Sequence, residues 1–102
     1  MIPAAPYTFV ANVDGESRTL HNDDQTKVVQ FTFAPGGGLA AHSAPFPASI
    51  YIVRGEGELQ LGEEKHPVSA GAFAQMSPKL EHAIRARTEL VMLLIINKAA
   101  RQ

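Results

Sequence analysis

The chain has 102 residues, of which 45% are hydrophobic, and this size suits one domain with a single core. Its formal net charge is −1 and its nine Lys and Arg are scattered, so no feature indicates binding to nucleic acid or to an anionic membrane. Cysteine is absent, which excludes disulfides and thiolate ligands and fits a reducing compartment. The first residues lack a signal-peptide pattern, and the longest apolar run, residues 90–96, is far shorter than the ~20 residues of a spanning helix. We therefore expect a cytoplasmic protein.

Short β-branched and alternating segments follow one another along the whole chain. Turn signals rich in Gly, Pro, Asn and Asp separate them about every 8–12 residues. The expected strands are residues 7–11, 17–20, 27–33, 39–44, 50–53, 55–61, 66–68, 73–76, 82–87 and 90–96. No helical stripe exceeds about two turns. This pattern predicts an all-β sandwich or barrel.

Side-chain alternation indicates which faces of two late strands look inward. In residues 82–87, His82, Ile84 and Ala86 share one face, while both arginines lie on the other. Residues 90–96 show no alternation, so both faces of that strand should be covered. Only one face of this strand can look into a barrel, so we predict that its other face forms a homodimer interface. We expect residues 99–102 to form a frayed tail.

Two segments each combine a glycine turn, an apolar strand and one histidine. In the first, Gly36, His42 and Gly55 match the pattern G-x5-H-x-H-x3-E-x6-G of the cupin family, which the chain resembles. In the second, Gly71 and His82 match the family pattern G-x5-P-x-G-x2-H-x3-N. The resemblance implies one cupin domain over residues 1–102, with a barrel core of about residues 27–97. The implied fold is a double-stranded β-helix, or jelly roll, of short antiparallel strands.

The ligand positions of the family motifs are depleted in this chain. Ala44 stands at the second histidine, and Ala48, or Ser49 with the longer spacer, stands at the carboxylate. Metal-bearing cupins hold a divalent ion with three histidines and one glutamate, so the resemblance leaves only His42 and His82 as metal ligands here. Open protein metal sites normally keep three ligands, and we expect at most a weakly held divalent ion.

An H-x-H pair on a strand has both side chains on one face, and here that inward face carries His42 and Ala44. His82 should reach the same interior from the second segment. Phe46 and Met76 lie near them in sequence and are candidates for the pocket lining, although aromatic and methionine side chains more often fill a core. Gln75 is a candidate hydrogen-bond donor to a ligand, or else it faces water. His21 and His66 lie in polar contexts, and we expect them to be exposed and without a role.

Three functions compete. The first is binding of a small molecule in a mostly apolar barrel interior, with His42 and His82 as hydrogen-bond partners. The second, implied by the resemblance, is a metal-dependent enzyme of the dioxygenase or isomerase type. The third is a metal-free enzyme with one of these histidines as general acid or base. The missing ligands favour the first, and the sequence leaves open the ligand and whether the protein is an enzyme.

Overall fold

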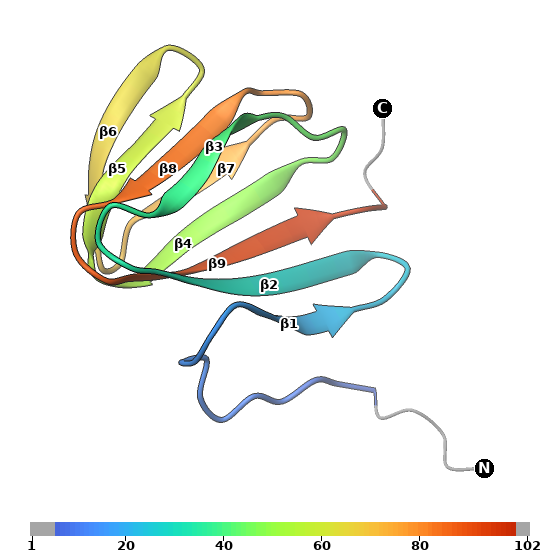
Figure 1. Ribbon diagram of the computed structural model, residues 1–102. Coiled ribbons are helices and arrows are strands. Elements are labelled where there is room, and N and C mark those ends of the chain that lie inside the picture. Colours follow the sequence, from blue (N-terminus) through green and yellow to red (C-terminus); the bar gives the residue numbers. More distant parts are fainter. Residues whose placement is uncertain (1–5, 100–102) are drawn as a thin grey trace.

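The computed structural model describes residues 6–99, so the N-terminal five residues and most of the expected tail lie outside the described residues. Within this range the chain forms nine strands and no helix, as expected for an all-β protein (Figure 1). The strands are β1 Arg18–Asn22, β2 Thr26–Phe33, β3 Gly38–His42, β4 Ala48–Arg54, β5 Glu56–Leu61, β6 Glu64–Ser69, β7 Phe73–Met76, β8 His82–Ala86 and β9 Leu90–Asn97.

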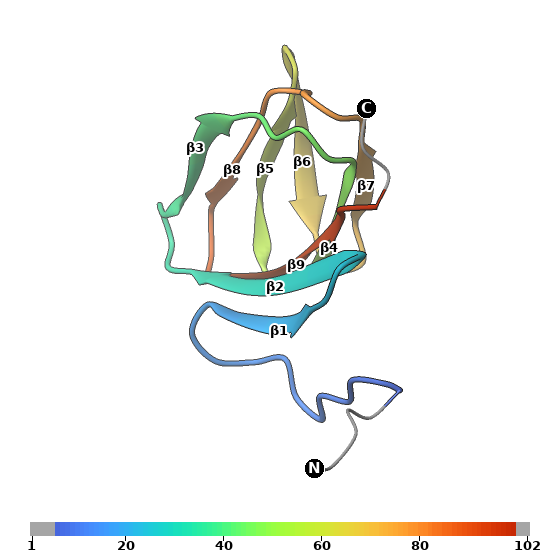
Figure 2. The same cartoon turned by 90° about the vertical axis from the view of Figure 1, so that its right-hand side faces the viewer.

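The strands form two antiparallel sheets that face each other (Figure 2). One sheet has five strands in the order β1-β2-β9-β4-β7, and the other has four in the order β3-β8-β5-β6. The chain passes repeatedly from one sheet to the other, for example from β3 to β4 and from β8 to β9. This arrangement is an all-β jelly roll, and it confirms the fold class that the sequence predicts.

The core lies between the two sheets and is built from alternate residues of the inner strands. Inward side chains of β4 meet those of β5, β8 and β9, and Leu90 and Met92 of β9 are fully buried. Phe31 and Phe33 of β2 pack against this cluster with their rings stacked 5.7 Å apart. The buried hydrophobic residues are Ala48, Ile50, Ile52, Leu59, Met76, Ile84, Ala86, Leu90, Val91 and Met92.

The outer face of β9 is covered at one end by the chain itself. The loop before β1 passes over the sheet there, and the carbonyl oxygen of Gly15 accepts hydrogen bonds from Gln30 Nε2 and Thr32 Oγ1 of β2. Gln30 and the outward Val91 are fully buried as a result. Leu93 and Ile95, farther along the same face of β9, keep partial exposure. A partner subunit, expected from the sequence, would therefore have to cover only the part of β9 that holds Leu93 and Ile95.

The structure corrects three details of the sequence interpretation. Residues 7–11 form no strand, because this segment has no ladder partner within the described chain. His21 belongs to β1 and not to the loop that follows it. Arg54, which the sequence leaves either solvated or paired with Glu56 or Glu58 across a hairpin, has its Nη1 2.6 Å from Asp14 Oδ1 and its Nη2 3.5 Å from Glu89 Oε1.

Candidate functional site

The site begins with a cross-strand pair of histidines. β3 pairs with β8 so that Leu39 lies opposite Ile84 and His42 lies opposite His82. The chain thus takes three steps along β3, from Leu39 to His42, against two steps along β8, and this one-residue difference marks a β-bulge. In a regular strand the odd spacing of three positions would point Leu39 and His42 to opposite faces of the sheet. The bulge places both of them on the inner face, beside the buried Ile84 and His82.

The two imidazole rings lie with their centroids 4.4 Å apart and their planes tilted by 59°. Nδ1 of His42 lies 2.9 Å from the carbonyl oxygen of Ala40, and Nδ1 of His82 lies 2.9 Å from that of Leu80. A carbonyl oxygen only accepts hydrogen bonds, so each Nδ1 carries the proton and donates it. In the neutral tautomer that follows, Nε2 of each ring keeps an unshared lone pair and can accept a hydrogen bond or bind a metal ion.

The rings line a cavity of about 120 Å³ between the two sheets. His82 is only 8% exposed, whereas His42 is exposed at the mouth. Ala44 and Ala48, which occupy the family's ligand positions, also line this cavity and leave it open beside the rings. Apart from the histidines and Ser77, all of the lining residues are apolar, and none is Asp, Glu, Lys or Arg. The lining residues are His42, Ala44, Phe46, Ala48, Met76, Ser77, Leu80, His82, Leu94 and Ile96.

Two of the three further pocket candidates share this cavity, and one does not. Phe46 and Met76 both lie in its wall. Gln75 points out of the barrel, because it alternates with the inward Met76 on β7. Its Oε1 accepts a hydrogen bond from Ser49 Oγ at 2.5 Å on the outer face of the sheet. Gln75 therefore does not line the cavity of the histidines, and its role as a donor to a ligand stays a prediction.

The protein side chains near the rings do not complete a metal site. Across residues 6–99, no group of three or more His, Asp or Glu side chains lies close enough to hold an ion. The two Nε2 atoms are ligands of the right chemistry, since ligating histidines usually donate their other ring N–H to a backbone carbonyl or carboxylate. A third protein ligand is missing where Ala44 and Ala48 stand. These residues therefore do not fit a tightly held resident metal.

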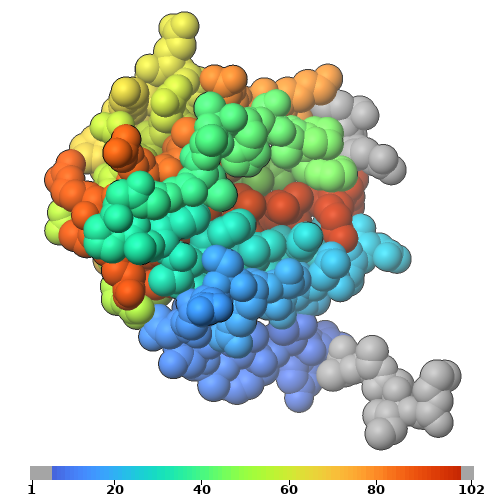
Figure 3. Space-filling model, viewed as in Figure 1, coloured from blue at the N-terminus to red at the C-terminus, as the bar shows by residue number. Residues whose placement is uncertain are grey.

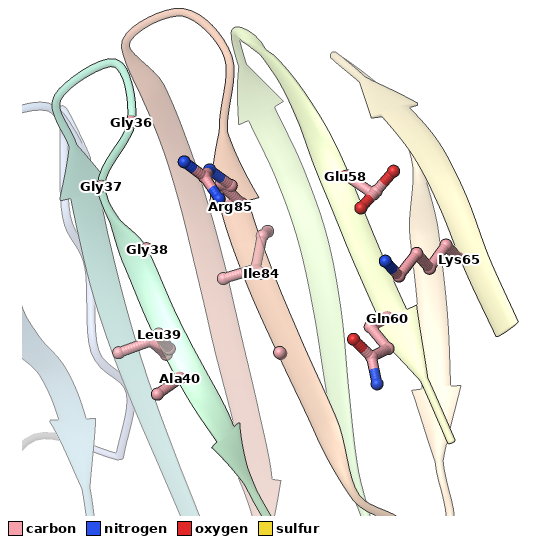
Figure 4. Close-up of a pocket in the computed structure, with 11 residues that line it drawn as sticks. Gly36, Gly37, Gly38, Leu39, Ala40, Glu58, Gln60, Lys65, Ile84 and Arg85 are labelled. Atoms are coloured by element: carbon pink, nitrogen blue, oxygen red, sulfur yellow. The ribbon is translucent and has the colours of Figure 1, made fainter. Parts of the chain in front are cut away.

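Larger depressions lie elsewhere on the described surface, two of them on the four-stranded sheet and beside β7. A polar hollow of about 450 Å³ lies on the outer face of the four-stranded sheet, where Glu58, Gln60, Lys65 and Arg85 surround small residues of β3 and β8 (Figure 4). An apolar groove of about 410 Å³ opens between β6 and β7, with Phe73 and Gln75 among its lining residues. Neither depression contains His42 or His82.

The other two histidines lie away from the cavity. His21 is partly exposed; its Nδ1 lies 2.6 Å from Thr8 Oγ1 and its Nε2 lies 2.8 Å from Asp23 Oδ2. Backbone N–H groups of Thr26 and Gln25, together with His21, lower the pKa of Asp23 to about 2. His66 is exposed and lies 3.4 Å from Glu64. These contacts fix local structure at the surface and assign neither histidine to the cavity.

A small antiparallel jelly roll with a histidine pair between its sheets defines the class of protein, the double-stranded β-helix proteins. The chain belongs to the cupin family, because the family model described as "Cupin domain" matches residues 29–96. No curated protein gives a significant match. The described part of the chain has no helix that could cross a membrane.

Solved cupin structures share the fold over nearly the whole chain. A cupin protein from Bacteroides fragilis is 22% identical, covers 95% of this chain and 88% of its own, and superposes with a TM-score of 0.80. A conserved protein of unknown function from Streptococcus pyogenes is 24% identical over 95% of this chain and 93% of its own, with a TM-score of 0.77. An RmlC-like cupin from Desulfovibrio desulfuricans is 25% identical over 96% and 98%, with a TM-score of 0.73. These likenesses support the fold.

Proposed function

We propose that the protein binds a small molecule in the cavity beside His42 and His82. The observation that carries this proposal is the matched hydrogen bonding of the two rings, in which each Nδ1 donates to the backbone carbonyl two residues before it. Two Nε2 acceptors are thereby left at an otherwise almost wholly apolar cavity. A pocket with an apolar wall and a few convergent polar atoms is the usual form of a small-molecule site.

The chemistry of the wall narrows the class of ligand. Two acceptors without a neighbouring donor from a charged side chain favour a ligand that brings its own O–H or N–H donor. The apolar remainder of the wall favours an uncharged, apolar body, because no Lys or Arg lines the cavity to balance an anion. The volume of about 120 Å³ is below the roughly 300 Å³ of common ligand pockets, so the ligand is small.

The test compares two probes that differ in one hydrogen-bond donor, phenol and anisole. Protein freed of metal by a chelator is labelled with ¹⁵N in its histidines, and the imidazole signals are followed during each titration. Phenol should shift the Nε2 signals of His42 and His82, whereas anisole should have a much smaller effect. His82→Phe should abolish the response to phenol. Equal responses to both probes, or none to phenol, would contradict the proposal.

The alternative is a metal-dependent enzyme, of the dioxygenase or isomerase type, in which His42 and His82 hold a divalent ion. The donated Nδ1–H bonds favour it, since they orient both rings as in ligating histidines. The shortage of protein ligands opposes it, because water would have to fill the remaining positions. Metal analysis of protein purified without a nickel affinity step distinguishes the two. A stoichiometric bound ion would favour the enzyme.

We also propose that residues 1–102 form one cytoplasmic cupin domain that acts as a homodimer. The absence of cysteine supports a reducing compartment. Leu93 and Ile95 on the outer face of β9 are partly exposed. Large apolar side chains on a surface strand support contact with a partner subunit, which would remove them from water. Light scattering at micromolar concentration tests the dimer, and a monomer would contradict it.

A further inference from the structure

The edge strands β6 and β7 border a groove between the two sheets. Each is the last strand of its sheet, so within the described chain each has a ladder partner on one side only. They lie next to each other in space (Figure 2), and the hairpin tip between β5 and β6 projects beyond the body of the molecule (Figures 1 and 3). The groove between them has a volume of about 410 Å³. Common ligand pockets measure roughly 300–1,000 Å³, so this groove can hold a whole small molecule.

The floor of the groove is the hydrophobic core. Ile50, Ile52 and Leu59 line it, and each of them is no more than 3% exposed. Ala74 lies opposite Ile50 on β7, and its small side chain leaves the groove open there. The lining contains no Asp, Glu, Lys or Arg. A molecule in the groove would therefore need an uncharged, apolar body, because an ion would lose its water here without gaining a counter-charge.

The rim of the groove carries one aromatic and two polar side chains. Phe73 of β7 is 64% exposed and offers a ring to an aromatic ligand. Gln75 accepts a hydrogen bond from Ser49 through its Oε1, and its Nε2 makes no hydrogen bond within the described chain. His66 has its Nε2 3.4 Å from Glu64 Oε1. A carboxylate oxygen only accepts, so Nε2 carries the proton, and Nδ1 of the neutral ring keeps a lone pair. The rim therefore offers one donor and one acceptor to a ligand.

The edges of the groove are poorly suited to the addition of a peptide strand. β7 has only four residues, Phe73–Met76. Pro67 lies within β6 and has no N–H, so a ladder along this edge would be interrupted. Short edge strands and edge prolines are means by which proteins prevent strand addition. The occupant that fits the groove is therefore a small molecule and not an extended segment of another chain.

We propose that this groove is a second ligand site, which binds an uncharged aromatic molecule that carries a carboxamide group. The aromatic ring packs on Phe73 and on the apolar floor. The amide carbonyl oxygen accepts a hydrogen bond from Gln75 Nε2, and the amide N–H donates to His66 Nδ1. This assignment gives Gln75 a donor role away from the histidine cavity. The two sites share no lining residue, so the inference goes beyond the proposed function and does not depend on it.

Two probes of the same shape, 2-naphthamide and 2-naphthoate, test the assignment by calorimetry at neutral pH. The amide should bind, and the carboxylate should bind at least about tenfold more weakly, because it lacks the N–H donor and carries a charge. Gln75→Met should raise the dissociation constant of the amide by about tenfold through the loss of one hydrogen bond. Gln60→Met makes the same change on the outer face of the other sheet and should leave this constant unchanged. No binding of the amide, or equal affinity for wild type and Gln75→Met, would overturn the inference.

Further measurements locate the probe and separate this site from other occupants. Ala74→Phe should abolish binding of the amide by filling the groove, and its melting curve shows whether it is folded. His82→Phe, which should lose the response to phenol, should bind the amide like wild type. Loss of amide binding in this variant would place the probe beside the histidines and overturn the inference. In analytical ultracentrifugation the amide should leave sedimentation unchanged. Dissociation of an assembly by the amide would show that a second copy occupies the groove, and this result would also overturn the inference.

Discussion

Arg54 at the end of β4 donates a hydrogen bond of 2.6 Å to Asp14, which lies 40 positions earlier in the chain. The Asp14 carboxylate raises the pKa of Arg54 further above its usual range, and Glu89 adds to the effect. The pair ties the loop before β1 across the outer face of the five-stranded sheet, close to the hydrogen bonds that Gly15 accepts from Gln30 and Thr32. A surface ion pair therefore helps to close the cover over Gln30 and Val91.

Loss of the Asp14 charge should weaken this cover in a salt-dependent way. Asp14→Asn is expected to lower the melting temperature slightly at low ionic strength, because both partners are about half exposed and such pairs contribute little. In 1 M salt the difference from wild type should vanish, since the Debye length falls to about 3 Å. Glu16→Gln, in the same loop, removes the same charge without a recorded ion pair and is the control. A deficit that persists at high salt would contradict the electrostatic explanation.

Gly55 should be far less replaceable than Gly36, although both have positive φ angles of 95° and 86°. A Cβ at Gly55 would lie 2.0 Å from the carbonyl oxygen of Glu89, whereas one at Gly36 would meet nothing within 4 Å. Gly36→Ala should thus cost only the backbone strain, about 1–2 kcal/mol in the free energy of unfolding. Gly55→Ala adds a steric overlap with the backbone and should cost on the order of 3 kcal/mol or more. Urea denaturation of the two variants tests this order, and equal losses would refute it.

Restoring the missing ligands should convert the cavity into a metal site. Ala44 and Ala48 line the cavity with the two histidines, so Ala44→His together with Ala48→Glu adds an imidazole and a carboxylate there. We expect the affinity for Co²⁺ to rise by more than about tenfold, measured by calorimetry and by the visible spectrum of the bound ion. Ala40→His with Ser49→Glu puts the same groups on outward positions and should not raise it. Melting curves show whether each variant is folded.

The hydrogen bonds that the Asp23 carboxylate accepts should make a contribution to stability that depends on pH in strong acid. The pKa of Asp23 is lowered from 3.8 to about 2, chiefly by the backbone N–H of Thr26. A lowered pKa means that the carboxylate stabilises the folded state above about pH 3.8, and that this contribution disappears as the pH falls towards 2. Asp23→Asn should therefore melt below wild type at pH 5, with the gap closing near pH 2. Asp24→Asn is the control, and a gap that is constant with pH would contradict the assignment.

Side-chain alternation predicted the parts of the structure whose ladders are regular. The pattern of β8 correctly placed His82 and Ile84 inside, and the absence of alternation in β9 correctly indicated cover on both faces for its first three residues, Leu90 to Met92. The cover over Val91 comes from the chain's own loop, which no local pattern reveals. Residues 7–11 have the composition of a strand but lack a ladder partner, so composition alone misled the prediction.

The sequence predicted only part of the candidate site. The motif spacing brought His42 and His82 together, and the structure places their rings 4.4 Å apart. Phe46 and Met76 were expected at the cavity from their nearness in sequence, and they line it. Gln75 lies outside it, in line with the alternative that its side chain faces water, because it alternates with Met76 on β7. The binding role of all these residues stays a prediction until a ligand is tested.

The bulge between Leu39 and His42 makes the direction of the His42 ring a matter of local pairing. If the pairing became regular with the segment at its present length, the odd spacing of three positions would turn the two side chains to opposite faces. With Leu39 kept in the core, the imidazole of His42 would then swing to the solvent side while the strand order stayed unchanged. Removal of one residue at position 40 or 41 would instead leave Leu39 and His42 two positions apart, and an even pleat would keep both on the inner face. A one-codon deletion should therefore preserve the direction of the ring in a strand that has lost its bulge.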